Sequence, residues 1–568
     1  MSWFIPVSLR ASVIGKIPGG FPRVLRAFLR RILIGPNGLE TAGFALDLDL
    51  DRPFLPNARL TDLLLDGEGL QRGLDWRGAG SLRPCLKHCN VLMKDSSLVR
   101  RDATNSYVEI TCNQPERFQR IGANDWGIAC DSLCEAERRV AAGTMTRVRF
   151  EQLGMALGMQ PNPLGLLADT ELRQHFDLVQ VVDYDWMHSC LQDGTLSVEL
   201  YLFLQACSRI GVASSDFEAY LKTDWCFPRR TASKSKELHR VFNEYRSRSS
   251  DRADKLKCTA SELLSVYGLV RQYVETRIPE RADLAAERKS FFAACTVVDL
   301  VLLAKRGTAD MRTAGGRVRE ALSFHLACHI ETYGTGWIKP KHHWMYDVCD
   351  QMERTDRPTF MADAFIVERL HLRVKPFAER TDNLKSFERS ILRCTLNAQI
   401  DSLQKQGIGS GLVGKSARCP GAPSILIADS MQILGRHFAV KDVVFHGDIA
   451  GEISACALED GELFVIVSAM RFDRTVHPLF VFLGGAVEMG PRWAHAWAPM
   501  DGPMDGPSLG PPCMGPKPLP PSHYEGISVS THSSTCLPTA ELQIWQAVMI
   551  EMSLAWRHDD DGLLIVRM

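Results

Sequence analysis

Apolar and polar positions follow two different patterns along this chain, and the change falls near residue 420. Between residues 195 and 405 apolar residues recur every three or four positions, which predicts helices. The longest expected helices span 259–276, 281–305, 318–332 and 386–404. Beyond residue 422, short apolar or alternating runs are separated by turn residues such as Asp460-Gly461, which predicts antiparallel strands of a small β-barrel-like module. The pattern therefore predicts a mixed α/β chain with a β-rich C-terminal module.

The stretch VVDYDWMHSCLQDG at residues 181–194 combines an apolar run with acids and a histidine. Asp185 and His188 are three residues apart, so a helix that begins here would bring both side chains to one face. A carboxylate beside an imidazole can bind a metal ion or form an acid–base pair. The alternative is structural: Asp185 caps the helix and His188 is a half-buried, hydrogen-bonded histidine.

Two other acids are candidate functional residues, one at the end of an apolar run and one on the face of an expected helix. Asp66 follows Leu63, Leu64 and Leu65 and precedes two glycines, which exposes a carboxylate but is also typical of an ordinary turn. Glu368 lies in the expected helix 365–377, where His371 and Lys375 share its face.

Soft metal ligands cluster once, in the segment Arg83-Pro84-Cys85-Leu86-Lys87-His88-Cys89. Cys85, His88 and Cys89 resemble half of a Zn²⁺ site, whose second half would come from Cys112 or from the Cys130/Cys134 pair. The alternative is a turn with two buried thiols.

Charge is balanced over the 568 residues, with a net charge of −1, so any nucleic-acid surface must come from local segregation. The segment 222–257 is the most basic part of the chain and the best candidate for phosphate contact, although a solvated connection is an equal alternative. The candidate nucleic-acid-binding residues are Arg229, Arg230, Lys234, Lys236 and Arg240, with Lys341 and Lys375 from later helices.

Several protein classes are excluded or disfavoured by composition. Seventeen scattered cysteines favour reduced thiols in a nuclear or cytoplasmic protein. No signal peptide is recognisable, and the apolar run 291–304 is too short to span a bilayer, so no membrane association is expected. The absence of a P-loop, dinucleotide fingerprint or nucleophile elbow argues against a small-molecule substrate. A Pro/Gly-rich stretch with MDGP twice predicts a disordered insertion at about 484–537.

Several segments together resemble the CACTA-like branch of the DDE transposases and proteins derived from them. DWMH is similar to the D-x-M-H segment of those enzymes, and PCLKHC to their cysteine pair, here with three intervening residues rather than two. The Asp-Gly at Asp66 is similar to their acid before the cysteine pair, and Glu368 in VERLH to their late glutamate. YGTGWIKPKHHWM and NPLGLLADTELR also carry the resemblance, which covers most of the chain.

The resemblance implies an α/β fold with an RNase H-like core and a large helical insertion. Residues 1–210 would form the first part of the core with the Cys/His cluster, 211–335 the insertion and 336–405 the closing helices. Residues 420–568 would form the β module. Asp66, Asp185 and Glu368, with His188, would be the catalytic set around two Mg²⁺ or Mn²⁺ ions, which activate the attacking oxygen in phosphoryl transfer.

One departure from the family concerns catalysis. The usual first aspartate should precede the segment matching Phe4 to Arg10, and the chain starts there, so the RNase H-like core is expected to be truncated and incomplete. The expected function is therefore DNA binding by a transposase-derived protein, in which DNA cleavage and strand transfer have degenerated, with homo-oligomers as a further expectation. The alternative is a non-catalytic protein-interaction scaffold built from a helical bundle and the β module.

Overall fold

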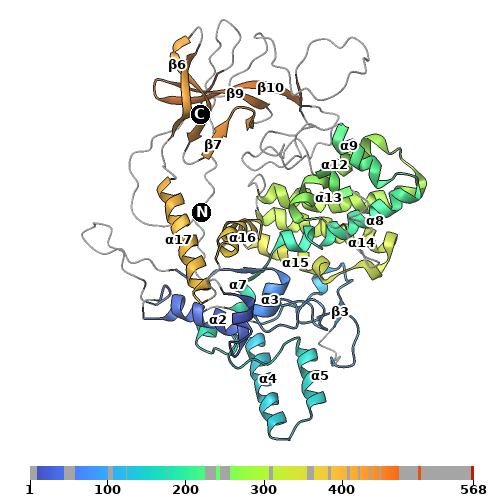
Figure 1. The fold of residues 1–568 in the computed structure, drawn as a ribbon. Helices are drawn as coiled ribbons and strands as arrows, with labels where there is room; N and C mark the ends of the chain where they lie inside the picture. The colour runs from blue at the N-terminus through green and yellow to red at the C-terminus, as the bar shows by residue number, and fades with distance from the viewer. Residues whose placement is uncertain are drawn as a thin grey trace. The chain divides into compact units, whose positions relative to one another are not determined.

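We describe the chain from a computed structural model (Figure 1). The structure describes residues 9–36, 38–41, 43, 58–99, 106–122, 124–175, 177–223, 238–242, 256, 258–305, 311–354, 364–381, 385–405, 410–419, 422–433, 436–446, 449–472, 497–499 and 565–567. It divides into two compact units. One contains residues 1–213, 247–263 and 280–397, and the other contains residues 214–246, 264–279 and 398–568.

The first part of the larger unit consists of short helices, long loops and three small strands. Its helical elements are α1 (Ala11–Ile14), α2 (Gly20–Leu29), η1 (Arg30–Ile34), α3 (Gly67–Gly73), η2 (Pro115–Arg117), α4 (Asp125–Ala141), α5 (Arg147–Leu157), α6 (Leu172–His175) and α7 (Leu178–Val181). Helices α4 and α5 form a hairpin that projects from this unit (Figure 1). Thr146 caps α5 by accepting a hydrogen bond from Arg149 N, and Gly158 ends the helix with a positive φ.

A pair of parallel strands connects two distant parts of this unit. Strand β1 (Leu63–Leu65) pairs with β4 (Val182–Tyr184), in the register Leu63 to Val182 and Leu65 to Tyr184. A second short parallel pair joins β2 (Val91–Leu92) to β3 (Val108–Glu109). All three residues of β4 are buried, so this strand lies inside the unit.

In the helical remainder of the larger unit, α13 packs on α8 and α14, and α14 packs on α15. Helix α13 carries Phe291, which stacks on Phe203 of α8 at 4.5 Å between ring centroids. The elements are η3 (Met187–Leu191), α8 (Thr195–Arg209), η5 (Ala282–Leu284), α13 (Ala285–Lys305), α14 (Met311–Tyr333), η6 (Thr335–Trp337), α15 (Pro340–Glu353) and α16 (Ala364–Glu379). Helix α17 (Phe387–Lys405) begins in this unit and ends in the other.

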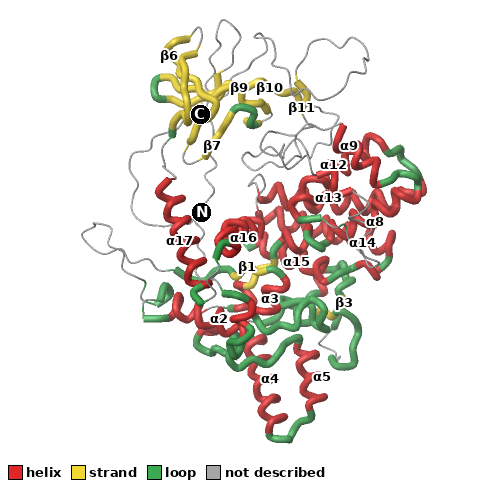
Figure 2. Tube along the Cα trace, in the orientation of Figure 1, coloured by secondary structure: helices red, strands yellow, loops and turns green. Residues whose placement is uncertain are grey.

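The smaller unit contains most of the strands (Figure 2). Its helical elements are α9 (Ser214–Thr223), η4 (Leu238–Phe242) and most of α12 (Ala260–Arg277). Its strands are β5 (Gly411–Cys419), β6 (Ala422–Ile433), β7 (Arg436–Ala439), β8 (Val443–His446), β9 (Ile449–Glu459), β10 (Glu462–Phe472), β11 (Trp497–Pro499) and β12 (Ile565–Arg567). They form one antiparallel sheet with the central order β11-β10-β9-β6-β5.

The turn between β9 and β10 follows directly from its sequence. Asp460 and Gly461 both have positive φ, 51° and 85°, and they connect the paired residues Glu459 and Glu462. Two-residue hairpin turns of this kind favour Asp-Gly, because glycine adopts positive φ without strain. The core of the sheet is formed by buried Met431, Ile453, Cys456 and Val465.

The expected mixed α/β character is confirmed: the described residues are mostly helical, with small sheets. The expected barrel is not seen, because the strands that the structure describes form an open path with β5 and β11 at its ends. The expected insertion at 484–537 lies outside the described residues except for β11.

Within the described part of the chain no single helix is long and apolar enough to cross a membrane. Only Met187–Arg209 and Ser214–Thr223 pass that test, when they are taken together as a bent pair. Most residues of α8 in this pair are buried inside the protein.

Candidate metal centres

The loop that carries Cys85 and His88 is held by hydrogen bonds from aromatic and arginine side chains. Trp344 Nε1 donates to the Pro84 carbonyl at 2.7 Å, and Trp126 Nε1 donates to the Leu86 carbonyl at 2.8 Å. The Tyr184 hydroxyl, at the end of β4, accepts from Leu86 N at 2.9 Å. Because these backbone groups are buried and paired, the loop presents its side chains in a fixed conformation.

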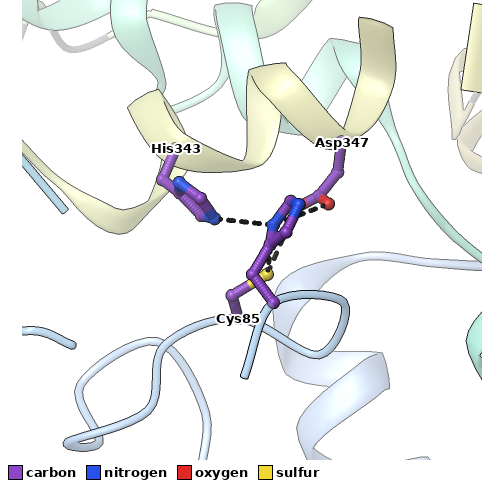
Figure 3. Close-up of side chains that lie close together, drawn as sticks. Cys85, His343 and Asp347 are labelled. Atoms are coloured by element: carbon purple, nitrogen blue, oxygen red, sulfur yellow. Dashed lines mark hydrogen bonds and ion pairs between the residues drawn. The ribbon is translucent and has the colours of Figure 1, made fainter. Parts of the chain in front are cut away.

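Helix α15 supplies the other side of this centre. His343 and Asp347 are four residues apart, so they lie on one face of the helix, about one turn from each other. Both point toward Cys85 on the loop (Figure 3). Trp344 of the same helix stacks on Tyr184 at 4.8 Å, which fixes α15 against β4.

The four side chains of Cys85, His88, His343 and Asp347 form cluster 1. The Sγ of Cys85 lies 3.5 Å from His88 Nδ1 and 3.3 Å from Asp347 Oδ2. His88 Nδ1 lies 3.1 Å from His343 Nε2 and 3.3 Å from Asp347 Oδ1. One atom of each residue lies within 4.8 Å of the other three, and all four residues are buried, so cluster 1 could hold a metal ion.

Burial favours the uncharged forms of these groups. It raises the pKa of the Cys85 thiol well above its usual value and that of Asp347 to about 6. It lowers the pKa of His88 to about 4 and that of His343 to about 3. His88 and Asp347 are therefore not a strong ion pair at neutral pH, in spite of their proximity. A cation would stabilise the thiolate and the carboxylate, which burial alone disfavours.

The hydrogen bonds within cluster 1 leave buried atoms unpaired. Asp347 Oδ1 and His343 Nδ1 have no hydrogen-bond partner. A buried unpaired polar group costs about 1–3 kcal/mol, and coordination of a metal by the Asp347 carboxylate would remove part of that cost.

A cavity of about 350 Å³ borders cluster 1 at His88. Its other walls include Phe118, Tyr346, Arg120 and Arg319. Both arginines pair with Asp350, and Arg319 also pairs with Glu353, so two carboxylates balance the two positive charges.

Cys89, the third predicted ligand of the loop, does not belong to cluster 1. Its Sγ lies 3.4 Å from the Gln119 carbonyl, on the other side of the turn from Cys85 and His88. The cysteines proposed for the second half of the site, Cys112 and the Cys130/Cys134 pair, also lie outside the cluster. The remaining ligands instead come from α15, far along the sequence.

The backbone segments that carry the acids predicted to be catalytic are neighbours. Asp66 and Asp185 each follow the last paired residue of a strand, since Leu65 pairs with Tyr184. The backbone N–H of Ala364, the first residue of α16, donates to Asp185 Oδ1 at 3.0 Å. Glu368 is one turn farther along α16, and its side chain is not among those described.

The carboxylates of Asp66 and Asp185 make different contacts. Asp66 is exposed and caps α3 by accepting from Gly69 N at 2.5 Å. Asp185 is buried and accepts from His188 N at 2.9 Å, in addition to Ala364 N. Its Oδ2 also lies 2.7 Å from His188 Nδ1. Asp185 therefore has the structural environment of a helix cap, and a metal ion would compete with these hydrogen bonds.

The predicted nucleic-acid-binding residues have mixed outcomes. Arg229, Arg230, Lys234 and Lys236 lie outside the described residues. Arg240 is exposed on η4, and Lys375 is exposed on α16, where it pairs with Glu379. Lys341 is directed inward and donates to the Gln192 carbonyl at 2.6 Å. Lys341 thus has a structural contact that its position in a basic stretch does not reveal.

A second buried group, cluster 2, consists of Glu199, His325 and His329. Sequence analysis does not select these residues, although a glutamate inside the apolar helix 196–204 and two histidines four residues apart are both visible signals. Glu199 has no exposed surface, and one ligand atom from each residue lies within 4.8 Å of the others. Cluster 2 could therefore also hold a metal ion.

Comparison with known proteins adds no relative to these observations. No family model, no curated protein and no solved structure matches the chain.

Proposed function

We propose that the chain is a transposase-derived nucleic-acid-binding protein whose DDE-type core is stabilised by a structural Zn²⁺ ion and no longer cuts DNA. One observation carries the proposal: the backbone segments that hold the three acids expected from the sequence are neighbours. Asp66 and Asp185 follow adjacent parallel strands, which are about 4.8 Å apart in a sheet. Glu368 lies about 6 Å along α16 from Ala364, whose N–H contacts Asp185.

Such a convergence is the backbone arrangement that two-metal phosphoryl transfer requires. It supports descent from an RNase H-like nuclease, with the helices from α9 to α14 in the place of the insertion expected at residues 211–335. Loss of cleavage is supported by the state of Asp185, whose carboxylate is buried and accepts from two backbone N–H groups. Carboxylate oxygens bind Mg²⁺ and Mn²⁺, and at Asp185 such an ion would compete with the hydrogen bonds from His188 and Ala364.

Zn²⁺ is the metal that fits cluster 1 best. Bonds of about 2.0–2.3 Å to Zn²⁺ place tetrahedral ligand atoms about 3.3–3.8 Å apart. In cluster 1, Cys85 Sγ lies 3.5 Å from His88 Nδ1 and 3.3 Å from Asp347 Oδ2. His88 Nδ1 lies 3.3 Å from Asp347 Oδ1 and 3.1 Å from His343 Nε2, so these separations are close to the expected range. One thiolate and one carboxylate balance the charge of the ion. Four protein ligands leave no open position, so this zinc would be structural and would join the loop to α15.

The test measures binding of the full chain to a labelled DNA duplex by fluorescence anisotropy over a range of KCl concentrations. Affinity should fall steeply with salt, because neutralised phosphates release counterions. The double variant Arg229→Glu with Arg230→Glu should lower the slope of log K against log salt by about 2 if both arginines contact phosphates. Arg138→Glu with Arg139→Glu, two exposed positions on α4, is the matched control and should leave the slope unchanged.

Incubation of the same protein with supercoiled plasmid and Mg²⁺ or Mn²⁺ tests the second half of the proposal. We expect no nicking. Nicking that Asp185→Ala abolishes would mean that the core is still catalytic. Absence of any salt-sensitive DNA binding would overturn the nucleic-acid role and favour the protein-interaction scaffold.

A further inference from the structure

Cluster 2 links two helices of the larger unit, α8 and α14, at their buried faces, and a third helix, α15, lies beside it. Glu199 comes from α8, and His325 and His329 come from successive turns of α14. His342, near the start of α15, has its ring 5.6 Å from that of His329. All four side chains are at most 1% exposed, so water does not stabilise their charges.

The Glu199 carboxylate stays charged in this setting. Burial raises its pKa, but hydrogen bonds from His325 and His329 outweigh that effect and lower the pKa to about 2. One oxygen, Oε2, serves both histidines: it lies 2.6 Å from His329 Nδ1 and 3.1 Å from His325 Nε2. A buried negative charge is thus present at a point where two imidazoles meet.

The surrounding polar atoms are incompletely paired. Four buried atoms around the cluster have no hydrogen-bond partner: Glu199 Oε1, His329 Nε2, His342 Nε2 and Tyr333 Oη. The rings of Tyr333 and His342 lie 5.2 Å and 5.6 Å from the His329 ring. At about 1–3 kcal/mol for each unpaired group, this arrangement would be a costly way to pack three helices. The cost falls if a ligand occupies the cluster.

We propose that Glu199, His325 and His329 form a second metal centre, which binds a divalent transition-metal ion such as Zn²⁺ inside the helical part. Two imidazoles and one carboxylate are an established ligand set for Zn²⁺, whereas Mg²⁺ prefers oxygen ligands alone. The ion takes the place of the hydrogen bonds between Glu199 and the two histidines. His342 Nε2, which is buried and has no hydrogen-bond partner, is a candidate for a fourth ligand. The centre joins α8 to α14, just as cluster 1 joins the loop to α15.

This second centre is independent of the proposed function and of cluster 1. The two clusters share no ligand, and cluster 2 contains no sulfur. The difference in ligands makes the two centres distinguishable by spectroscopy and by mutation.

The experiment measures zinc in the purified full chain by mass spectrometry of the elements, after dialysis against a weak chelator. We expect two equivalents for the wild type. Glu199→Gln and His329→Gln should each lose one equivalent and keep the other, and Cys85→Ser should do the same. Retention of one equivalent shows that a variant is folded. The control is Glu40→Gln, which removes the carboxylate of a half-buried pair, Glu40 with His175, that has no third ligand. It should keep both equivalents.

Cobalt replacement tests the centre without any mutation, so a variant that does not fold leaves the question answerable. The equivalent of Co²⁺ that fills cluster 1 should produce a sulfur-to-cobalt charge-transfer band. The equivalent that fills cluster 2 should add visible absorption without such a band. The proposal is overturned if Glu199→Gln and His329→Gln both keep the full zinc content of the wild type. It is also overturned if the wild type binds a single equivalent that Cys85→Ser removes and Glu199→Gln retains.

Discussion

Removal of the Cys85 thiol should show how much zinc bound at cluster 1 contributes to the free energy of unfolding. The change is Cys85→Ser, which keeps the volume of the side chain nearly constant and replaces the soft thiolate with a poor zinc ligand. Its matched control is Cys89→Ser, four residues away, because the Cys89 thiol contacts the Gln119 carbonyl and not the cluster. Both variants are compared with the wild type, with zinc buffered in excess and with a strong chelator.

The size of the effect follows from linkage. At a free zinc concentration about 100 times Kd, binding to the folded state contributes about 2.7 kcal/mol. The unit that holds cluster 1 comprises about 350 residues. At about 2.1 cal/mol/K for each residue, its unfolding entropy is about 0.7 kcal/mol/K, so the ion should raise Tm by about 4 °C.

Differential scanning calorimetry measures this shift. The chelator should lower Tm about 4 °C more in Cys89→Ser than in Cys85→Ser, since only the former retains cluster 1. Any contribution from cluster 2 is common to both variants and cancels in the comparison. Equal chelator effects in the two variants would refute the assignment of Cys85 as a ligand, and a smaller effect in Cys89→Ser would reverse it.

Two further predictions concern single carboxylates. Asp185→Ala should destabilise the protein by about 3 kcal/mol in urea denaturation, because the backbone N–H groups of His188 and Ala364 lose their acceptor. Asp66→Ala should destabilise it by only about 1 kcal/mol, because Asp66 is an exposed helix cap. Equal costs would argue against the buried role of Asp185. Burial raises the pKa of Asp75 to about 6, although a hydrogen bond from Asn162 opposes this effect. Because the folded state then binds a proton more tightly than the unfolded state, the wild type should gain stability as pH falls through 6 toward 4. Asp75→Asn suits the positive φ of this residue and removes the buried charge, so the variant should be more stable at pH 8, and its advantage should vanish near pH 4 in thermal denaturation. An advantage that is constant with pH would show that the charge is not its cause.

Local patterns predicted those features of the fold that depend on neighbouring residues. The helices from α13 to α17 and the Asp460-Gly461 hairpin follow from apolar spacing and turn chemistry. The strand pairings of the C-terminal sheet depend on non-local registers, and periodicity does not contain them. The expectation of a barrel was therefore not confirmed.

The same limit applies to the metal centres. Cys85 and His88 could be selected because their spacing is typical of metal ligands, and so was Cys89, which faces the other side of the turn. His343 and Asp347 could not be selected, since no local pattern tells which helix packs on a loop more than 250 residues away. Glu199 was missed for another reason: an apolar helical pattern conceals one charged residue unless its cost of burial is considered.

Because the ligands of cluster 1 are far apart in the sequence, they emerge from the ribosome at different times. Cys85 and Asp347 are 262 residues apart along the chain. At a ribosomal rate of about 5–20 residues per second, a nascent chain waits about 13–50 seconds between the appearance of the first ligand and the last. During that interval Cys85 and His88 are a partial site open to oxidation or to other thiophilic ions. Correct folding of the segment that carries Cys85 and His88 should therefore depend on the reducing capacity and the zinc supply of the cell until α15 has been synthesised.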